Sequence, residues 1–126
     1  MKSNIELSSL NHTWIFDIDG TIVKHNGYKI DGTDTLLPGI KEFFDENICE
    51  NDYVLLVTSR TDEFKEITEK FLNENKIRFN NIIFGLPYGE RILINDRKPS
   101  GLDMSIAINT NRNQVIEDKI IINNNL

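Results

Sequence analysis

The chain has 126 residues, of which 39% are apolar and 27% charged, a composition typical of one globular domain with a hydrophobic core. We therefore expect a single domain over residues 1–126. Its formal net charge of −6 and the lack of a basic run argue against nucleic acid as a partner. The chain has no apolar segment long enough for a membrane span or a signal peptide, and Cys49 is the one cysteine, so no membrane association and a cytoplasmic location are expected.

The first predicted strand is the apolar run 13–18, which leads into two carboxylates. Asp17 and Asp19 are separated by one residue and are followed by Gly20-Thr21. Side chains alternate along a strand, so both carboxylates point the same way if the strand stays regular. Two like charges this close are unfavourable unless a cation lies between them or one is protonated. The pair therefore indicates a functional site.

The next segment, residues 22–37, contains Gly27 and Gly32 as breakers between short apolar islands. This pattern predicts a small hairpin or flap. Pro38-Gly39 then opens a predicted helix that runs to about residue 47, with its apolar side chains at helical spacing.

A second strand is predicted at 53–57, an unbroken apolar run typical of a strand covered on both faces. Thr58, Ser59 and Arg60 follow it directly. Asp62 is expected to cap a following helix, whose single apolar stripe consists of Phe64, Ile67, Phe71 and Leu72.

Three further strands are predicted at 82–84, 92–94 and 104–108, the second ending at Asn95-Asp96. The polar tail 109–126 is compatible with a last strand, a short helix or a subunit contact. Alternating strands and helices predict an α/β fold, a doubly wound, Rossmann-like and mainly parallel sheet with helices on both faces. In such sheets, sites lie at the carboxyl ends of the strands.

The polar side chains at these strand ends suit magnesium and a phosphoryl group. Mg²⁺ prefers oxygen ligands and keeps several waters, so a few carboxylate and carbonyl oxygens are enough protein for it. The metal would relieve the repulsion between Asp17 and Asp96 and neutralise phosphate charge. One carboxylate of the pair could attack phosphorus and the other could protonate the leaving group.

The segments 16–21, 54–60 and 92–96 resemble, in order, the first, second and fourth motifs of the haloacid dehalogenase-like superfamily. The resemblance covers roughly residues 12–108. It implies a Mg²⁺-dependent hydrolase in which Asp17 is the nucleophile and a metal ligand. It also implies that Asp19 is the general acid/base and gives its backbone carbonyl to the metal, that Thr58 with Ser59 binds phosphate, and that Asp96 is the third protein ligand.

The chain departs from this family in two places. The cation of the third motif has no helix before the last acid, and Lys98 and Arg91 are the available candidates. We prefer Lys98, because it follows Asp96 closely at the active end of the strand, although a turned-back loop would favour Arg91. A second acid often adjoins the fourth motif, and here Asn95 stands in that place while Asp103 lies further on.

The stretches 22–37 and 60–81 are too short for an inserted lid domain, so the resemblance implies a capless phosphatase. Capless relatives include phosphatases of sugar acids in polysaccharide biosynthesis, and a homo-oligomer is one way to close an open site. A phosphotransferase, a phospho-receiver signalling domain and a non-catalytic binding subunit with the same fold are the competing interpretations. In a receiver domain the middle strand ends in an acceptor aspartate, whereas here it ends in Thr58.

Overall fold

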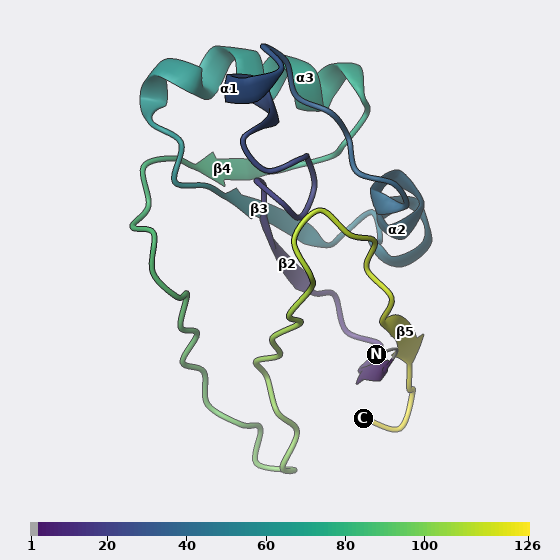
Figure 1. Ribbon diagram of the computed structural model, residues 1–126. Helices are drawn as coiled ribbons and strands as arrows, with labels where there is room; N and C mark the ends of the chain where they lie inside the picture. The colour runs from purple at the N-terminus through teal and green to yellow at the C-terminus, as the bar shows by residue number, and fades with distance from the viewer. Residues whose placement is uncertain (1–2) are drawn as a thin grey trace. The chain divides into compact units, whose positions relative to one another are not determined.

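In a computed structural model that describes residues 3–126, the chain forms two compact units (Figure 1). Of the described residues, the first unit contains 3–10 and the segments Tyr88–Asn109 and Glu117–Leu126. The second unit contains Asn11–Pro87 and Thr110–Ile116. Both units are therefore built from stretches that are distant in the sequence.

The second unit contains a parallel sheet of three strands in the order β2-β3-β4. These strands are β2 (Thr13–Asp17), β3 (Tyr53–Val57) and β4 (Asn81–Ile83). The central β3 lies where the unbroken apolar run predicts it. The predicted strands 13–18 and 82–84 are confirmed as β2 and β4, with bounds that differ by a residue or two. The carboxyl ends of β2 and β3 lie side by side, because Asp17 is the register partner of Val57.

One face of this sheet carries the core of the unit. Phe16 of β2 and Val54 and Leu56 of β3 are buried there. The predicted helix after Pro38 is confirmed as α2 (Ile40–Asn47). Its Phe44 ring packs on Phe16 with ring centroids 4.7 Å apart. On the opposite face, Ile15 and Ile83 are exposed, and the predicted cover of helices on both faces of this sheet is not confirmed.

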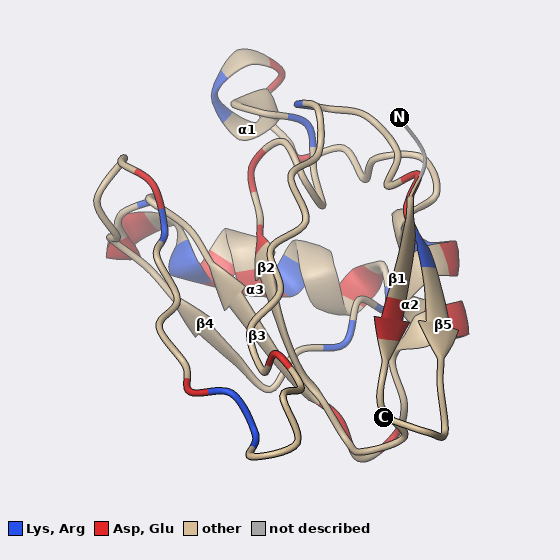
Figure 2. Ribbon diagram, turned by 90° about the horizontal axis from the view of Figure 1, so that it is seen from below, with Lys and Arg blue, Asp and Glu red and all other residues tan. Residues whose placement is uncertain are grey.

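The segment after β3 is helical as predicted, although its start and its apolar face differ from the prediction. A short 3-10 turn, η1 (Asp62–Phe64), precedes α3 (Lys65–Glu74), and the side chain of Asp62 caps neither. The predicted stripe was wrong for Ile67, which is exposed, whereas Thr68 is buried. A helix covers the sheet with only part of its circumference, and Figure 2 shows acidic and basic positions interspersed along the rest of α3.

The predicted flap between β2 and α2 is a small hairpin with a helical turn at its tip. An isolated antiparallel bridge joins Val23 to Leu36. The backbone N–H of Lys24 donates to the carbonyl of Thr35 over 2.9 Å. The tip contains α1 (Gly27–Ile30). Hydrogen bonds at its base therefore give the flap a defined conformation.

The first unit contains a parallel pair of strands, β1 (Asn4–Leu7) and β5 (Lys119–Ile122). A strand was one of the alternatives left open for the tail, whereas β1 was not predicted. The register places Ile5 beside Ile120.

Two predicted strands in the first unit were wrong. Residues 92–94 and 104–108 have no regular secondary structure, and the side chains of Ile92 and Ile94 are 82% and 89% exposed. An apolar run becomes a strand only where a neighbouring strand accepts its backbone hydrogen bonds. In this region the backbone bonds are local, as in the turn in which Lys98 donates to the carbonyl of Leu102.

The molecule thus has an α/β fold with parallel strands in two small sheets. None of the helices within residues 3–126 combines the length and the apolar character needed to cross a membrane.

Candidate functional site

The site begins where the chain leaves β2 in a tight turn. The carbonyl of Ile18 accepts hydrogen bonds from the backbone N–H groups of Thr21, Ile22 and Val23, at 3.3, 2.9 and 3.1 Å. Gly20 adopts a φ of 88°, a conformation that costs glycine little and other residues considerably more. The strand therefore ends at Asp17, and its alternation of side chains does not continue to Asp19.

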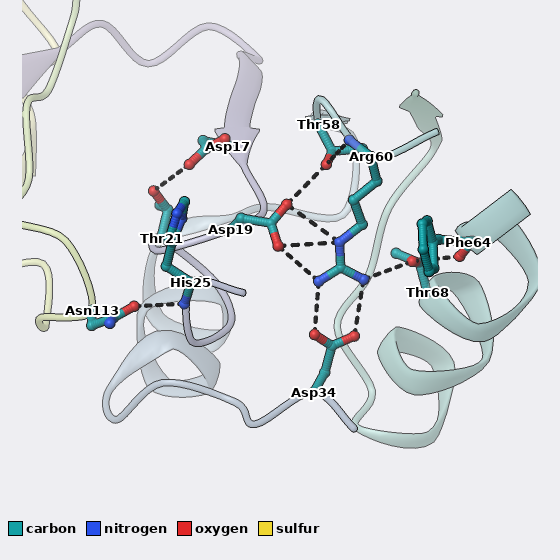
Figure 3. Close-up of polar contacts among 10 residues, drawn as sticks. All are labelled: Asp17, Asp19, Thr21, His25, Asp34, Thr58, Arg60, Phe64, Thr68 and Asn113. Atoms are coloured by element: carbon teal, nitrogen blue, oxygen red, sulfur yellow. Dashed lines mark hydrogen bonds and ion pairs between the residues drawn. The ribbon is translucent and has the colours of Figure 1, made fainter. Parts of the chain in front are cut away.

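The two carboxylates consequently turn toward different partners (Figure 3). Oδ2 of Asp17 accepts a hydrogen bond from Oγ1 of Thr21 over 3.1 Å. Asp19 faces the other way, toward Thr58 and Arg60. Both aspartates are partly exposed, so each can be reached from solvent while its partners hold it.

Thr58 lies at the end of β3 and connects this strand to Asp19. Its hydroxyl donates to Oδ2 of Asp19 over 2.9 Å and accepts the backbone N–H of Arg60 over 3.1 Å. Thr58 is fully buried, and in this state its proton is directed at Asp19. Ser59 is partly exposed and donates to the carbonyl of Pro87 over 3.3 Å.

Arg60 is the residue around which this half of the site is organised. Its side chain is only 1% exposed and forms ion pairs with Asp19 and Asp34 at 2.8 and 2.7 Å. Burial disfavours the charged guanidinium, but the bonds to Asp34 and Asp19 outweigh this effect and raise the pKa of Arg60. The ring of Tyr28 lies 3.9 Å from the guanidinium carbon, a favourable cation–π contact.

The sequence analysis placed Arg60 after the second predicted strand without giving it a role, and it did not single out Asp34, Tyr28 or Thr68 as site residues. Asp34 and Tyr28 belong to the flap, so their contacts with Arg60 depend on how the chain folds back. One signal was available in the sequence. Arg60 follows a buried strand by only three positions, where a surface charge would have little room.

A short return segment, residues 110–116, closes over the turn after β2. The N–H of Asn113 donates to the carbonyl of Gly20 over 2.8 Å, and Oδ1 of Asn113 accepts the N–H of His25 over 2.7 Å. A Cβ on Gly20 would lie 3.2 Å from Cγ of Arg112. The glycine therefore permits both the turn and the close approach of this segment.

The other predicted site residues belong to the first unit. Asp96 is exposed, and its carbonyl accepts a hydrogen bond from Asn95. Arg91 is exposed and Lys98 half-buried, and Asp103 forms an ion pair with Arg97. The structure thus brings Asp17, Asp19 and Thr58 together within one unit, while the roles of Asp96, Arg91 and Lys98 stay predictions.

The donor chemistry around Asp17 suits a hard cation, since carboxylate and carbonyl oxygens are the ligands that Mg²⁺ prefers. Within residues 3–126, no three or more His, Cys, Asp or Glu side chains are grouped so as to hold a metal ion. Both oxygens of Asp19 are engaged by Thr58 and Arg60.

No protein-family model matches the chain, and no curated protein or solved structure gives a significant match.

Proposed function

We propose that the protein is a phosphomonoesterase that acts through an aspartyl-phosphate on Asp17. The observation that carries this proposal is the geometry of the β2 and β3 strand ends. Asp17, a partly exposed carboxylate at the end of β2, accepts a hydrogen bond from Thr21, whereas Asp19 is engaged separately by Thr58 and Arg60. Two carboxylates in different environments suit a nucleophile and a proton carrier.

In the proposed reaction, an oxygen of Asp17 bonds to phosphorus while the bond from phosphorus to the ester oxygen breaks. Asp19 gives its proton to that leaving oxygen. A water molecule then attacks the phosphorus of the intermediate, Asp19 takes the proton from this water, and Asp17 is released as a carboxylate together with inorganic phosphate. The hydrogen bond from Thr21 orients Asp17 for attack.

Mg²⁺ is the cofactor that this proposal includes, with Asp17, the backbone carbonyl of Asp19 and Asp96 as the residues that would hold it. When bound, it would neutralise charge on the phosphoryl group. Lys98, or else Arg91, would supply a further positive charge, with Ser59 near the phosphate. The doubly wound sheet implied by the resemblance would need residues 92–94 as an additional strand beside these ligands.

The proposed substrate is a small phosphorylated metabolite, with sugar and sugar-acid phosphates of polysaccharide biosynthesis as the first class to test. The flap 22–37 is the segment of the second unit that could act as a lid. It is a short hairpin and not an inserted domain. With so short a flap, closure of the site over a small substrate would come from a second copy of the chain.

The test is phosphate release from p-nitrophenyl phosphate and from a panel of phosphorylated sugars and sugar acids, with Mg²⁺ present. Asp17→Asn removes the negatively charged oxygen that attacks phosphorus, and we expect turnover to fall by at least about a thousandfold. Chelation of the metal should stop the reaction, and added Mg²⁺ should restore it.

The matched control is Asp62→Asn, the same change at an exposed position in η1. We expect it to leave turnover unchanged. Persistent turnover in Asp17→Asn would disprove the proposed mechanism.

A non-catalytic binding domain is the second candidate. The observation that favours it is the segment around Asp96, which forms no strand. This alternative predicts no Mg²⁺ binding by calorimetry and no phosphate release from any substrate of the panel, because an intact site should bind the metal.

A further inference from the structure

We propose that Asp34 is a positioning residue for Asp19, and that it acts entirely through the guanidinium of Arg60. The inference rests on the proposed function, because it concerns the residue that carries the proton in that reaction. Asp34 lies in the flap, and its side chain is only 4% exposed. It is therefore too buried to touch a substrate itself.

The hydrogen bonds of Arg60 account for every N–H of its guanidinium. Arginine has five such donors, and they are distributed as follows. Nε donates to Asp19, Nη2 donates to Asp19 and Asp34, and Nη1 donates to Asp34 and Thr68. No donor is left for a phosphate group, so Arg60 holds carboxylates in place and does not bind substrate.

The two carboxylates hold Arg60 in complementary ways (Figure 3). Asp34 receives two parallel bonds of 3.0 and 2.7 Å from Nη1 and Nη2, the forked geometry that fixes a guanidinium plane. Thr68 of α3 accepts a third bond of 2.8 Å, and Tyr28 covers the face of the group. The flap and α3 thus set the orientation of Arg60 independently of its contact with Asp19.

Arg60 in turn distinguishes the two oxygens of Asp19. Oδ1 accepts bonds of 2.8 and 3.1 Å from Nη2 and Nε, whereas Oδ2 receives only a longer contact of 3.3 Å from Nε. The other partner of Oδ2 is the hydroxyl of Thr58, at 2.9 Å. Arg60 and Thr58 together therefore fix the orientation of the Asp19 carboxylate.

Asp34→Asn is the variant that tests this inference. It replaces one acceptor oxygen with an NH₂ group, so that two hydrogen-bond donors face each other. It also removes the negative charge of Asp34, which leaves Asp19 as the one carboxylate paired with Arg60. Proton donation matters for an alkyl phosphate, whose leaving oxygen is strongly basic, and hardly at all for p-nitrophenyl phosphate. A misplaced proton donor therefore affects these two substrates differently.

We expect kcat for an alkyl phosphate to fall by about ten- to a hundredfold in Asp34→Asn, while kcat for p-nitrophenyl phosphate and both KM values stay close to wild type. The control is Asp31→Asn in the same flap, which removes only a surface ion pair with Lys24 and should leave both rates unchanged. A purely structural defect would lower kcat equally for both substrates, and that result would overturn the inference.

Thr68→Val provides a second variant if Asp34→Asn does not fold. It removes the hydrogen bond from Nη1 and the one that Thr68 donates to the carbonyl of Phe64, and it keeps the volume of the side chain. We expect the same selective loss of kcat on the alkyl phosphate, at a smaller size. Equal losses on both substrates, or none, would again overturn the inference. If the wild-type protein releases phosphate from neither substrate, the proposed function fails and this inference fails with it.

Discussion

At the scale of the residue, Asp52 shows how one buried carboxylate ties several segments together. It lies just before β3 and accepts the backbone N–H groups of His12 and Cys49, each over 2.9 Å, and the indole N–H of Trp14 over 3.0 Å. Burial alone would raise the pKa of Asp52, but these hydrogen bonds outweigh it and hold the pKa below its ordinary value of 3.8. The ionised form is thus the one that the fold stabilises.

This gives a prediction for the pH dependence of stability. Because the pKa is lowered on folding, the stabilisation from Asp52 is fully present above pH 3.8 and is lost as the pH falls through the lower value of the folded state. At neutral pH, Asp52→Asn should reduce the free energy of unfolding by about 2 kcal/mol. The difference from wild type should shrink as the pH is lowered below 3.8, as measured by urea unfolding.

The control for this prediction is Asp45→Asn, which removes a surface pair with Lys41 and should cost well under about 1 kcal/mol at either pH. A deficit for Asp52→Asn that is equally large under acidic conditions would contradict the assigned role of the carboxylate.

Sequence reasoning predicted the site residues unevenly, for a physical reason. Asp17, Asp19 and Thr58 follow apolar runs directly, so their placement at strand ends depends on local composition. Arg60 and Asp34 are paired across the flap, and no periodicity in the chain relates them. Their ion pair exists only because the hairpin at Val23 and Leu36 brings the flap back over the end of β3.

At the scale of the element, the start of α2 depends on a backbone conformation that most residues adopt only at a cost. Gly39 precedes the helix with a φ of 81°, and a Cβ placed there would lie 2.6 Å from Cγ2 of Val115 in the return segment. Sequence reasoning predicted the helix correctly from Pro38-Gly39. The contact with Val115 was not accessible to it, because nothing local links the two positions.

Gly39→Ala should therefore destabilise the protein more than the same change at Gly32, which has a similar φ of 78° and no atom within 4 Å of the added Cβ. We expect about 1 kcal/mol for Gly32→Ala from backbone strain alone. At Gly39 we expect at least about 1 kcal/mol more from the collision. Thermal or urea unfolding of the two variants provides the comparison.

A double variant identifies the cause. Val115 is exposed, so Val115→Ala is cheap by itself, and it should recover part of the loss in Gly39→Ala. Strictly additive losses would show that Val115 does not limit the space at Gly39.

At the scale of the whole molecule, the two units differ in how their backbones are satisfied. β3 pairs with a strand on each side, whereas residues 92–94 have no strand partner and expose their apolar side chains. Composition cannot distinguish these two apolar runs. Such a run forms a strand only where another strand lies beside it and pairs with its backbone, and that depends on the assembled fold.

Hydrogen exchange measures this difference directly. We expect the amides of residues 92–94 to exchange with solvent far faster than those of β3, because only the latter have ladder partners. Amides of the exposed loop around Gly32 provide a reference for rapid exchange. Protection at residues 92–94 comparable to that of β3 would contradict this structure and favour the doubly wound sheet.

The return segment has a consequence for how the protein is made. The carbonyl of Gly20 receives its hydrogen bond from Asn113, a residue that is synthesised after all three strands of the β2-β3-β4 sheet. Strands β2, β3 and β4 can pair earlier, because all of them precede Pro87. The nascent protein can thus assemble its sheet while the turn beside Asp17 and Asp19 is still incomplete, and that turn closes only once the return segment has been added.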